Sequence, residues 1–428
     1  MTPAAEPTLS LATRARRARR IGGTVGRAWL GLRTQRWIER TLAPPDMDAR
    51  WREQHRRNAR DLYDAAVELQ GLILKGAQLL GSRPDVLPPD TVSVLSRLQD
   101  RVPARPHAVV RRAVERELGH PLPTVFRRFA KAPVASASLA QVHEAELLDG
   151  RRVAVKVQYP GIGALVRSDL GSLRFVLGAL ARVERDFDWQ PMLDELAEAV
   201  PRELDFVREG RNAERVARDL AARTDLRIPR VIWEHTTRRV LVMEYMEGIR
   251  IGDHAALRTA GVDLERLAQS LLEIFCDQIF EHGFFHADPH PGNLLVEPAG
   301  PRLVLLDFGL SKELPAEFRR GVLEVAGALL VGRTEGLGEA LVRLGFETRE
   351  GRGDSLQAIA ELLRWAGKEV RSRGRLDPDT VDRLREEIPE RIRRDPIIRI
   401  PSHLVLVGRA LGLLSGQVAA LGARVDLL

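Results

Sequence analysis

The chain has little cysteine and few aromatic residues, and it contains no long uncharged apolar run. Its single cysteine, Cys276, excludes a disulfide framework and is typical of a protein from a reducing compartment. Cys276 lies in the apolar run LLEIFCDQIF, where we expect it to be a core residue. Residues 404 to 423 come closest to a membrane span, but Arg409, Ser415 and Gln417 interrupt them, so no spanning helix is expected. No apolar segment with a cleavage site indicates a secretory signal, and the expected location is therefore cytoplasmic.

Lysine is scarce as well, since only five of the 66 basic residues are lysines and the rest are arginines. The net charge of +7 on 428 residues is modest, and no motif combines aromatic and basic residues for base stacking. Nucleic acid is therefore not an expected partner. The 44% hydrophobic content is enough for a large core spread over two or three lobes.

The basic residues are densest near the N-terminus. Five arginines lie within residues 14–20, and Ile21, Val25, Trp29 and Leu32 follow at helical spacing between further arginines. Such a basic amphipathic helix predicts contact with an anionic membrane surface, as a peripheral protein on its inner face. The alternative is a disordered basic tail over residues 1–20, followed by an ordinary packing helix.

Two short stretches in the second half of the chain carry the chemistry. The first, FFHADPHPGNLLV, begins at residue 284 and places Asp288 five positions before Asn293, with His286 two positions before the aspartate. This is the spacing of the kinase catalytic loop H-R-D-x-x-x-x-N. The second, LVLLDFGLS, begins at residue 303 and contains the Asp-Phe-Gly tripeptide that starts at Asp307.

Phosphoryl transfer requires positioning of the phosphate and neutralisation of its charge, mainly through metal ions. Mg²⁺ takes oxygen ligands, which the Asn293 amide and the Asp307 carboxylate supply. Asp288 is then free to orient or deprotonate an acceptor. Because the motifs occur together and follow a lysine strand, they predict a site for ATP and Mg²⁺ rather than chance tripeptides in a loop.

That strand is RRVAVKVQ, residues 151–158, in which three valines alternate with Ala154, Lys156 and Gln158 after an Asp-Gly hairpin turn. Lys156 occupies the position of the V-A-I-K lysine, whose ammonium group pairs with the α- and β-phosphates. The alternative is an ordinary exposed lysine on a strand. Since lysine is so rare in this chain, a lysine at position 156 favours pairing with the phosphates over an ordinary exposed strand residue.

The loop before this strand lacks the glycines of a protein kinase. Residues 135–143 are ASASLAQVH, which puts Ala135, Ser136, Ala137 and Ser138 where backbone amides would close over the phosphates. With this alanine-rich loop and the HADPHPGN sequence at residues 286–293, the chain resembles the UbiB/AarF/ADCK family of atypical kinases.

Two further motifs of that family match this sequence. Its Lys-x-Gly-Gln motif corresponds to Lys75 through Gln78, with alanine in the third position, and its Glu-x-Asp motif corresponds to Glu203 and Asp205. The resemblance implies that Lys75 and Gln78 lie on a lid helix that faces Glu203 and Asp205. Glu209 is the candidate carboxylate to pair with Lys156, and Glu203 is the alternative. Positions 203 and 209 would lie about 240° apart around a helix, so one carboxylate cannot easily pair with both Lys75 and Lys156. The alternative for these acidic residues is a solvated helix face.

The predicted fold is α+β, a protein-kinase-like fold of two lobes with an N-terminal helical extension. The expected parts are a basic segment (1–48), a helical extension (49–130), a β-rich lobe (131–248) and a helical lobe (249–428). The backbone of Met243 to Met246, including Glu244, is expected to line the adenine slot. No Ala-Pro-Glu sequence or long activation segment follows Asp307, so a protein substrate is not expected.

The spacing of apolar residues also predicts individual elements. Helices are expected at 58–80, 107–118, 165–187 and 192–220, the last kinked or broken at Pro201, and a helical tail is expected to run to Leu428. Strands are expected at 134–148, 151–158, in two runs within 227–248, at 294–296 and at 303–306.

Three functions fit these residues. The first is an atypical Mg²⁺-dependent ATPase or phosphotransferase, which the resemblance links to isoprenoid quinone biosynthesis or lipid homeostasis at a membrane, with an unknown small-molecule or lipid acceptor. The second is a small-molecule phosphotransferase of the aminoglycoside or choline kinase kind, which would not explain the alanine-rich loop. The third is a nucleotide-binding pseudoenzyme that acts as a scaffold, which the presence of Lys156, Asp288, Asn293 and Asp307 disfavours.

Overall fold

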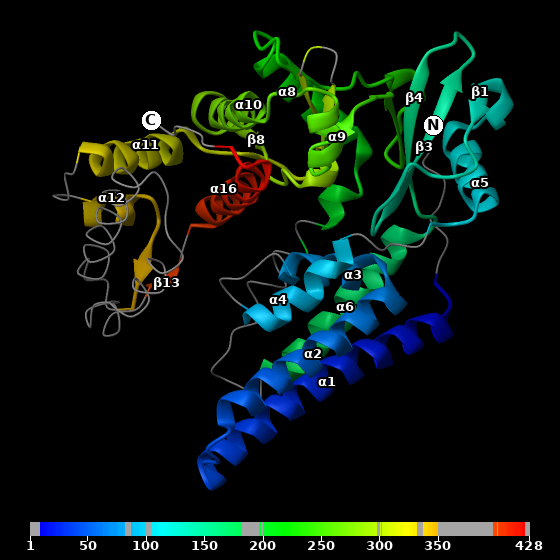
Figure 1. Cartoon of the computed structure of the whole chain (residues 1–428). Helices are drawn as coiled ribbons and strands as arrows, with labels where there is room; N and C mark the ends of the chain where they lie inside the picture. The colour runs from blue at the N-terminus through cyan, green and yellow to red at the C-terminus, as the bar shows by residue number, and fades with distance from the viewer. Residues whose placement is uncertain are drawn as a thin grey trace. The chain divides into compact units, whose positions relative to one another are not determined.

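The structure is a computed structural model of the whole chain (Figure 1). It describes residues 9–81, 87–99, 104–181, 197, 200–297, 300, 302–331, 337–349, 397–399 and 401–423. The chain forms two compact units. Unit 1 consists of Met1–Gly210 and Arg230–Tyr245, and unit 2 of Arg211–Pro229 and Met246–Leu428. Both contain helices and antiparallel strand pairs, which confirms the α+β class.

The first part of unit 1 is helical. Where one helix was expected over 58–80, the structure has two, because Gln70 and Gly71 adopt φ angles of +52° and +59°. A Cβ on Gly71 would lie 2.6 Å from the Leu165 side chain, so the turn requires glycine. The helices of this part are α1 (Leu11–Leu42), α2 (Met47–Leu69), α3 (Gly71–Gly81), α4 (Pro89–Leu95), the 3₁₀ turn η1 (Ser96–Gln99) and α6 (Ile162–Ala181).

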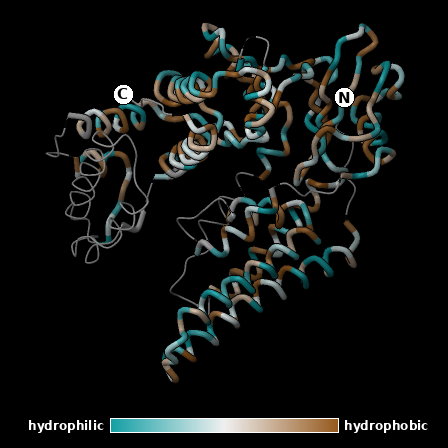
Figure 2. Tube along the Cα trace, in the orientation of Figure 1, coloured by the Kyte–Doolittle hydropathy of each residue, from teal (hydrophilic) through white to brown (hydrophobic). Residues whose placement is uncertain are grey.

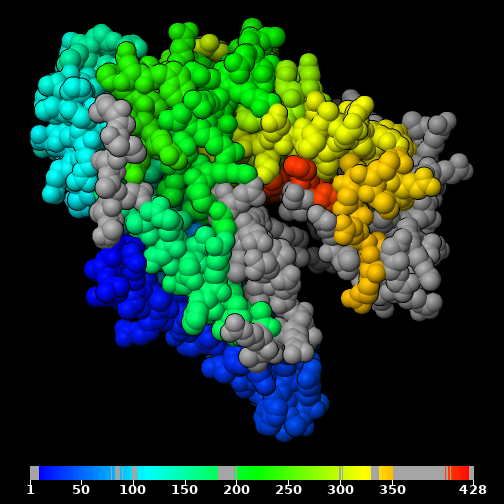
Figure 3. Space-filling view, turned by 180° about the vertical axis from the view of Figure 1, so that it is seen from behind, coloured from blue at the N-terminus to red at the C-terminus, as the bar shows by residue number. Residues whose placement is uncertain are grey.

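Helix α1 packs against α2 and α6, and Figure 3 shows α1 beside α6 at the surface. Hydrophilic and hydrophobic residues are mixed along α1 (Figure 2). Ile21 is buried in the core of these helices. Arg17 is buried too: its Nε lies 2.8 Å from Oδ1 of the buried Asp169 and its Nη1 donates to the Leu69 carbonyl at 2.7 Å. Because α1 begins at Leu11 and buries Arg17, the alternative of a disordered basic tail is wrong for residues 11–20, and Ile21 confirms packing in the segment that follows. Residues 1–8 lie outside the described residues.

The second part of unit 1 is a twisted antiparallel sheet with strand order β1-β3-β4-β6, in which β2 also pairs with β3. One face packs on α5 and η2 through apolar residues of both, including Val110, Val114, Val153 and Val155. The other face carries Lys156. The elements are α5 (His107–Leu118), η2 (Leu122–Thr124), β1 (Phe126–Phe129), β2 (Ala135–Ser136), β3 (Ala140–Leu147), β4 (Arg152–Gln158), η3 (Trp233–His235) and β6 (Val240–Glu244).

His143 on β3 is fully buried on the α5 side of this sheet. Its Nδ1 lies 2.8 Å from the Ala130 carbonyl and its Nε2 lies 2.7 Å from the Gln141 amide nitrogen. A carbonyl only accepts, so Nδ1 carries the proton and Nε2 accepts. Burial lowers the pKa of His143 below its ordinary value of 6.5.

We therefore expect unit 1 to lose stability as the pH falls below 6.5. In that range His143 is protonated in the unfolded chain, but in the folded protein its lowered pKa keeps it neutral. The loss is about 1.4 kcal/mol for each pH unit between the unfolded and folded pKa values. Urea denaturation between pH 7.5 and 5 measures it. The variant His143→Gln should show a shallower pH dependence, and an unchanged slope would contradict the assignment.

Unit 2 is built around a sheet of order β5-β10-β9-β7 and a strand pair β8-β11. Helix α16 packs against α10, and its Val407 and Ala410 join the core that surrounds Phe285 and Ala287. The helical elements are α8 (Phe206–Asp219, shared with unit 1), α9 (His254–Thr259), α10 (Leu264–Cys276), the π-helix η4 (Asp277–His282), η5 (Pro291–Asn293), α11 (Ala316–Val331), α12 (Leu337–Arg343) and α16 (Ser402–Leu421). The strands are β5 (Leu226–Arg227), β7 (Ile249–Arg250), β8 (Phe284–His286), β9 (Leu294–Glu297), β10 (Arg302–Leu305), β11 (Ser311–Glu313), β12 (Glu347–Thr348) and β13 (Ile397–Arg399).

Three further expectations were wrong. Cys276 is exposed, because it lies on the outer side of α10 between the buried Phe275 and the start of η4. Pro201 lies within a helical turn over 200–203, and the chain breaks instead at Leu204 and Asp205, where the aspartate caps the next helix.

The first of the two β-runs within 227–248 forms only the short β5, an isolated bridge and η3. Most of residues 192–199 and the end of the predicted tail, 424–428, lie outside the described residues. Within the described ranges, every helix is either too short or too polar to span a bilayer.

Candidate functional site

In unit 1, the alanine-rich loop and the lysine strand belong to one ladder. Ala135 on β2 pairs with Val142 on β3, and Val142 pairs with Lys156 on β4. Directly paired residues project from the same face of a sheet, so the loop and the lysine share the face opposite α5. A tight turn closes the loop, since the Ala137 amide donates to the Ala140 carbonyl at 2.8 Å.

The side chains along this loop differ in exposure. Ala135 and Ala137 are exposed, Ser136 is half-buried and Ser138 is buried. The small exposed alanines leave the outer edge of the turn open, which is the requirement for a close approach of backbone amides to a phosphate.

Lys156 is not the ordinary exposed strand lysine. It is only 8% exposed, and its Nζ lies 2.7 Å from Oε1 of Glu209, which is 3% exposed. The ammonium group also lies 5.2 Å from the ring centroid of Phe206. It is thus Glu209, and not Glu203, that pairs with Lys156.

The residues of the Glu-x-Asp motif flank the start of α8. The Asp205 carboxylate caps that helix by accepting from the Arg208 amide at 3.2 Å, and it lies 3.3 Å from Arg238. Glu203 ends the preceding helical turn and forms an ion pair with Lys75 of α3 at 2.8 Å. The break between 203 and 206 means that the two acidic motif residues do not share one continuous helix.

The other residues of the lysine motif face the core of the helical part. The Gln78 amide donates to the Leu98 carbonyl at 2.9 Å, which ties α3 to η1. Ala77, where the family motif has glycine, is 1% exposed, and its methyl group packs in the same core as Leu74 and Leu69.

The predicted adenine segment runs from one unit to the other. Glu244 ends β6 in unit 1, where its amide donates to the Arg230 carbonyl at 2.8 Å. Met246 is buried and belongs to unit 2.

In unit 2, a hairpin aligns the two predicted metal ligands. Strands β9 and β10 pair so that Leu294 lies opposite Leu305, and the Leu306 amide donates to the Asn293 carbonyl at 2.9 Å. Asn293 lies just before β9 and Asp307 just after β10, so the two residues lie at the same end of the hairpin. Asp307 has φ +58° and accepts from the Gly309 amide at 3.3 Å.

The Asn293 side chain has a defined orientation. Its Nδ2 donates to the Asp288 carbonyl at 3.2 Å, so the amide oxygen faces the other way. An amide and a carboxylate oxygen at one hairpin end suit Mg²⁺, which takes its remaining ligands from water and phosphate. Among the described residues, no group of three or more His, Cys, Asp or Glu side chains is arranged to hold a metal ion.

His286 is buried and engages both ring nitrogens. Its Nδ1 accepts from the Asp288 amide at 3.3 Å, so the proton lies on Nε2, which donates to the Leu306 carbonyl at 3.0 Å. The ring also meets Phe308 edge to face at 5.4 Å. His286, a predicted catalytic residue, thereby connects the loop that carries Asp288 to the segment that carries Asp307.

Sequence reasoning missed two residues that hold this loop. Arg409 of α16 lies with its Nη2 2.9 Å from the Asp288 carboxylate, and Gln417 of the same helix donates to the Pro289 carbonyl. Both are polar residues that interrupt the apolar stretch 404–423. This interruption was the feature of the sequence that could have indicated polar contacts made by the helix. Asn212 of α8 donates to the Phe308 carbonyl at 3.0 Å and so fixes the segment after Asp307.

Comparisons with known proteins give matches over most of the chain. Residues 97–340 match the family model described as ABC1 atypical kinase-like domain. The chain is 34% identical over 382 residues to AarF domain-containing protein kinase 1 of Xenopus laevis. This match covers 86% of the chain and 72% of that protein. It is 38% identical over 293 residues to the chloroplastic protein ACTIVITY OF BC1 COMPLEX KINASE 8 of Arabidopsis thaliana, covering 67% of the chain and 38% of that protein.

Among solved structures, the complex of Rv3197 with erythromycin, from Mycobacterium tuberculosis, is similar to the chain, with a TM-score of 0.58 and 26% identity. The match covers 88% of the chain and 95% of Rv3197.

Proposed function

Because the chain belongs to the ABC1 atypical kinase-like family, we propose that it binds ATP with Mg²⁺ and either hydrolyses it or transfers its γ-phosphoryl group. The observation that carries this proposal is the buried Lys156–Glu209 ion pair, 2.7 Å long, on the sheet face that also bears the alanine-rich loop. A buried charge pair is costly to retain for stability alone, and a lysine aimed at phosphates explains its presence.

Each remaining residue takes one task in this proposal. Ala135 to Ser138 cover the phosphates, Lys156 contacts them, and the segment that includes Glu244 and Met246 reads the adenine edge. Mg²⁺, when bound, would neutralise phosphate charge between Asn293 and Asp307. Asp288 orients or deprotonates the acceptor.

The acceptor and the location are the finer part of the proposal. We propose a small molecule or lipid as acceptor, in isoprenoid quinone biosynthesis or lipid homeostasis, because the segment after Asp307 turns through β11 directly into α11 and offers no long docking segment. The Lys75–Glu203 ion pair supports a lid formed by α3, in which Gln78 and Asp205 also take part. The exposed arginines of α1, such as Arg33 and Arg36, support a cytoplasmic protein that touches an anionic membrane.

ATP consumption by the full chain tests the proposal, measured with Mg²⁺ or with EDTA, with and without anionic phosphatidylglycerol vesicles, and with alkylated phenols as acceptors. We expect Mg²⁺-dependent turnover that vesicles or phenols increase. Nucleotide binding without turnover under every condition would favour a scaffold instead. Turnover that persists in EDTA would contradict the metal site.

Arg409 should act as a positioning residue for this reaction. In Arg409→Leu, Asp288 loses the guanidinium that holds its carboxylate, so we expect kcat to fall about tenfold while the affinity for ATP stays unchanged. Arg409→Lys should recover part of the rate, because lysine keeps the charge without the planar fork. The matched control is Arg343→Leu, which removes an exposed ion pair with Glu324 and should leave kcat unchanged. Equal rates in both leucine variants would refute this role.

A further inference from the structure

His290 lies inside the catalytic loop, between Asp288 and the candidate metal ligand Asn293. Its amide donates to the Asp288 carbonyl at 2.7 Å, and its carbonyl accepts from the Asn293 amide at 2.8 Å. These two hydrogen bonds form one tight turn over residues 288–293. The position of His290 is therefore fixed relative to the backbone of both residues.

The imidazole ring of His290 folds back onto this turn. Its Nδ1 accepts from the Gly292 amide at 2.9 Å. A backbone amide only donates, so Nδ1 carries no proton and the single proton of the ring lies on Nε2. The ring is half-buried, and within the described part of the chain it makes no other hydrogen bond. The loop thus presents one oriented N–H donor.

The two residues after His290 explain why the ring can take this position. Because a proline follows, His290 is held in an extended conformation, with φ −73° and ψ 144°. The φ angle of Gly292 lies outside the left-handed region, so its backbone does not require glycine. A Cβ at Gly292 would instead lie 2.9 Å from Nδ1 and from Cε1 of the imidazole. The glycine therefore leaves room for the ring, and this observation is independent of the hydrogen bond.

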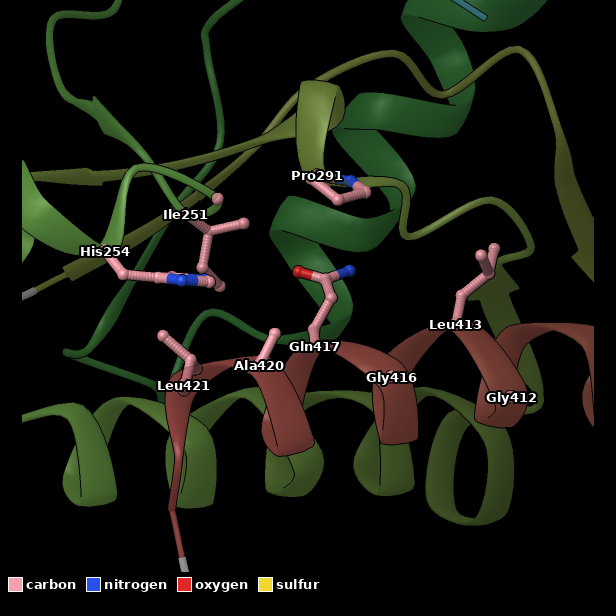
Figure 4. Close-up of a pocket in the computed structure, with 10 residues that line it drawn as sticks. Ile251, His254, Pro291, Gly412, Leu413, Gly416, Gln417, Ala420 and Leu421 are labelled. Atoms are coloured by element: carbon pink, nitrogen blue, oxygen red, sulfur yellow. The ribbon is translucent and has the colours of Figure 1, made fainter. Parts of the chain in front are cut away.

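Helix α16 contacts the neighbours of His290 in the loop. Gln417 donates to the Pro289 carbonyl, and Pro291 lines an open apolar pocket beside α16 (Figure 4). His290 does not line that pocket. Its imidazole is therefore not explained by packing on α16, and its Nε2 is available to a group bound at the loop itself.

We propose that His290 is a further catalytic residue, whose Nε2 donates a hydrogen bond to an oxygen of the γ-phosphoryl group of ATP. This inference rests on the proposed function. Asn293, at the other end of the same turn, is the proposed ligand of the cation that neutralises the phosphates, so the donor and the phosphates meet at one loop. A preorganised N–H aimed at a phosphate oxygen stabilises the negative charge of the transition state.

His290 keeps its proton throughout the reaction. The bond from phosphorus to the oxygen that bridges the β- and γ-phosphates breaks, and a bond from phosphorus to the acceptor oxygen forms. The acceptor proton goes to Asp288. Nε2 already carries the proton of the ring and so cannot act as a base, while Nδ1 is occupied by the Gly292 amide. The role of His290 is hydrogen-bond donation alone.

The variant His290→Phe tests the role, because phenylalanine keeps a ring of similar shape without either nitrogen. We expect kcat for ATP to fall about a hundredfold, while the affinity for ADP stays unchanged. ADP with aluminium fluoride mimics the transferring phosphoryl group and should bind about a hundredfold more weakly to this variant than to the parent chain. His290→Gln should recover part of both losses, since its amide still donates. A merely structural role would weaken both nucleotide complexes equally and so refute the proposal.

Gly292→Ala displaces the ring without removing it, so kcat should fall about tenfold. The matched control is Gly327→Ala, on α11 of the same unit, where a Cβ meets no other heavy atom within 4 Å and the rate should be kept. A parent chain that neither binds the two nucleotide complexes nor consumes ATP would refute the proposed function and this role with it. A parent chain that consumes ATP no faster than His290→Phe would refute the role of His290 alone.

Discussion

Replacing Asp307 by asparagine should reduce Mg²⁺-dependent ATP turnover by about a thousandfold. The carboxylate lies at the end of the β9–β10 hairpin beside Asn293, and it is the charged member of the proposed metal pair. Asparagine keeps the shape and one oxygen but removes the negative charge that holds a divalent cation. The loss of turnover therefore measures how much the negative charge of Asp307 contributes to binding Mg²⁺, and so to neutralising the phosphates.

Asparagine is the informative substitution because of the backbone at this position. Asp307 has φ +58°, in the left-handed region that asparagine enters much more readily than most residues. The asparagine oxygen can also accept from the Gly309 amide, as the carboxylate does at 3.3 Å. Alanine would add backbone strain to the loss of the ligand and so confuse the two effects.

The measurement is ATP hydrolysis over a Mg²⁺ titration, compared with the melting temperature of each variant. Asp263→Asn is the matched control, since Asp263 caps α10 in the same unit and asparagine caps helices equally well. We expect the control to retain both its melting temperature and its turnover. Turnover that survives Asp307→Asn unchanged would remove Asp307 from the metal site.

Much of the fold and of the candidate site could be predicted because their signals are local. The alternation of valines around Lys156 is a property of one strand, and the turn before it consists of adjacent residues, so β4 and its hairpin follow from the sequence. The helix expected at 107–118 is α5 with the same bounds, since apolar spacing marks one face and Gly119 ends it with φ +74°. The β9–β10 hairpin is equally local.

The rest depended on contacts between distant parts of the chain. Arg409 and Asp288 are 121 positions apart, and no spacing rule relates an arginine in a late helix to one aspartate in a loop. Arg17 and Asp169 are 152 positions apart, and composition gives no sign that this arginine of the basic segment is buried in an ion pair with α6. The break of the predicted helix at Gln70 arises likewise from tertiary packing, because Gly71 abuts Leu165.

Separating Lys156 from Glu209 should produce the second large effect, this time on stability as well as on binding. In Glu209→Leu the buried ammonium loses the carboxylate 2.7 Å away, and in Lys156→Met the buried carboxylate loses its cation. We expect each single variant to lower the free energy of unfolding by about 3 kcal/mol, because a charge stays in the interior without that partner. The double variant should recover much of this loss, since neither charge is then buried.

Nucleotide affinity separates this structural effect from the functional one. ATP binding should be lost in Lys156→Met and also in the double variant, even though the double variant regains stability, because Lys156 is the member of this pair that we propose to contact the phosphates. Urea denaturation and a fluorescent ATP analogue measure the two quantities in the same samples. The control is Arg128→Met, which removes a pair of the same 2.7 Å length, Arg128–Glu144, from an exposed part of the same sheet and should cost less than about 1 kcal/mol. If the double variant bound ATP as tightly as the parent chain, Lys156 would be a structural residue and the nucleotide site would lie elsewhere.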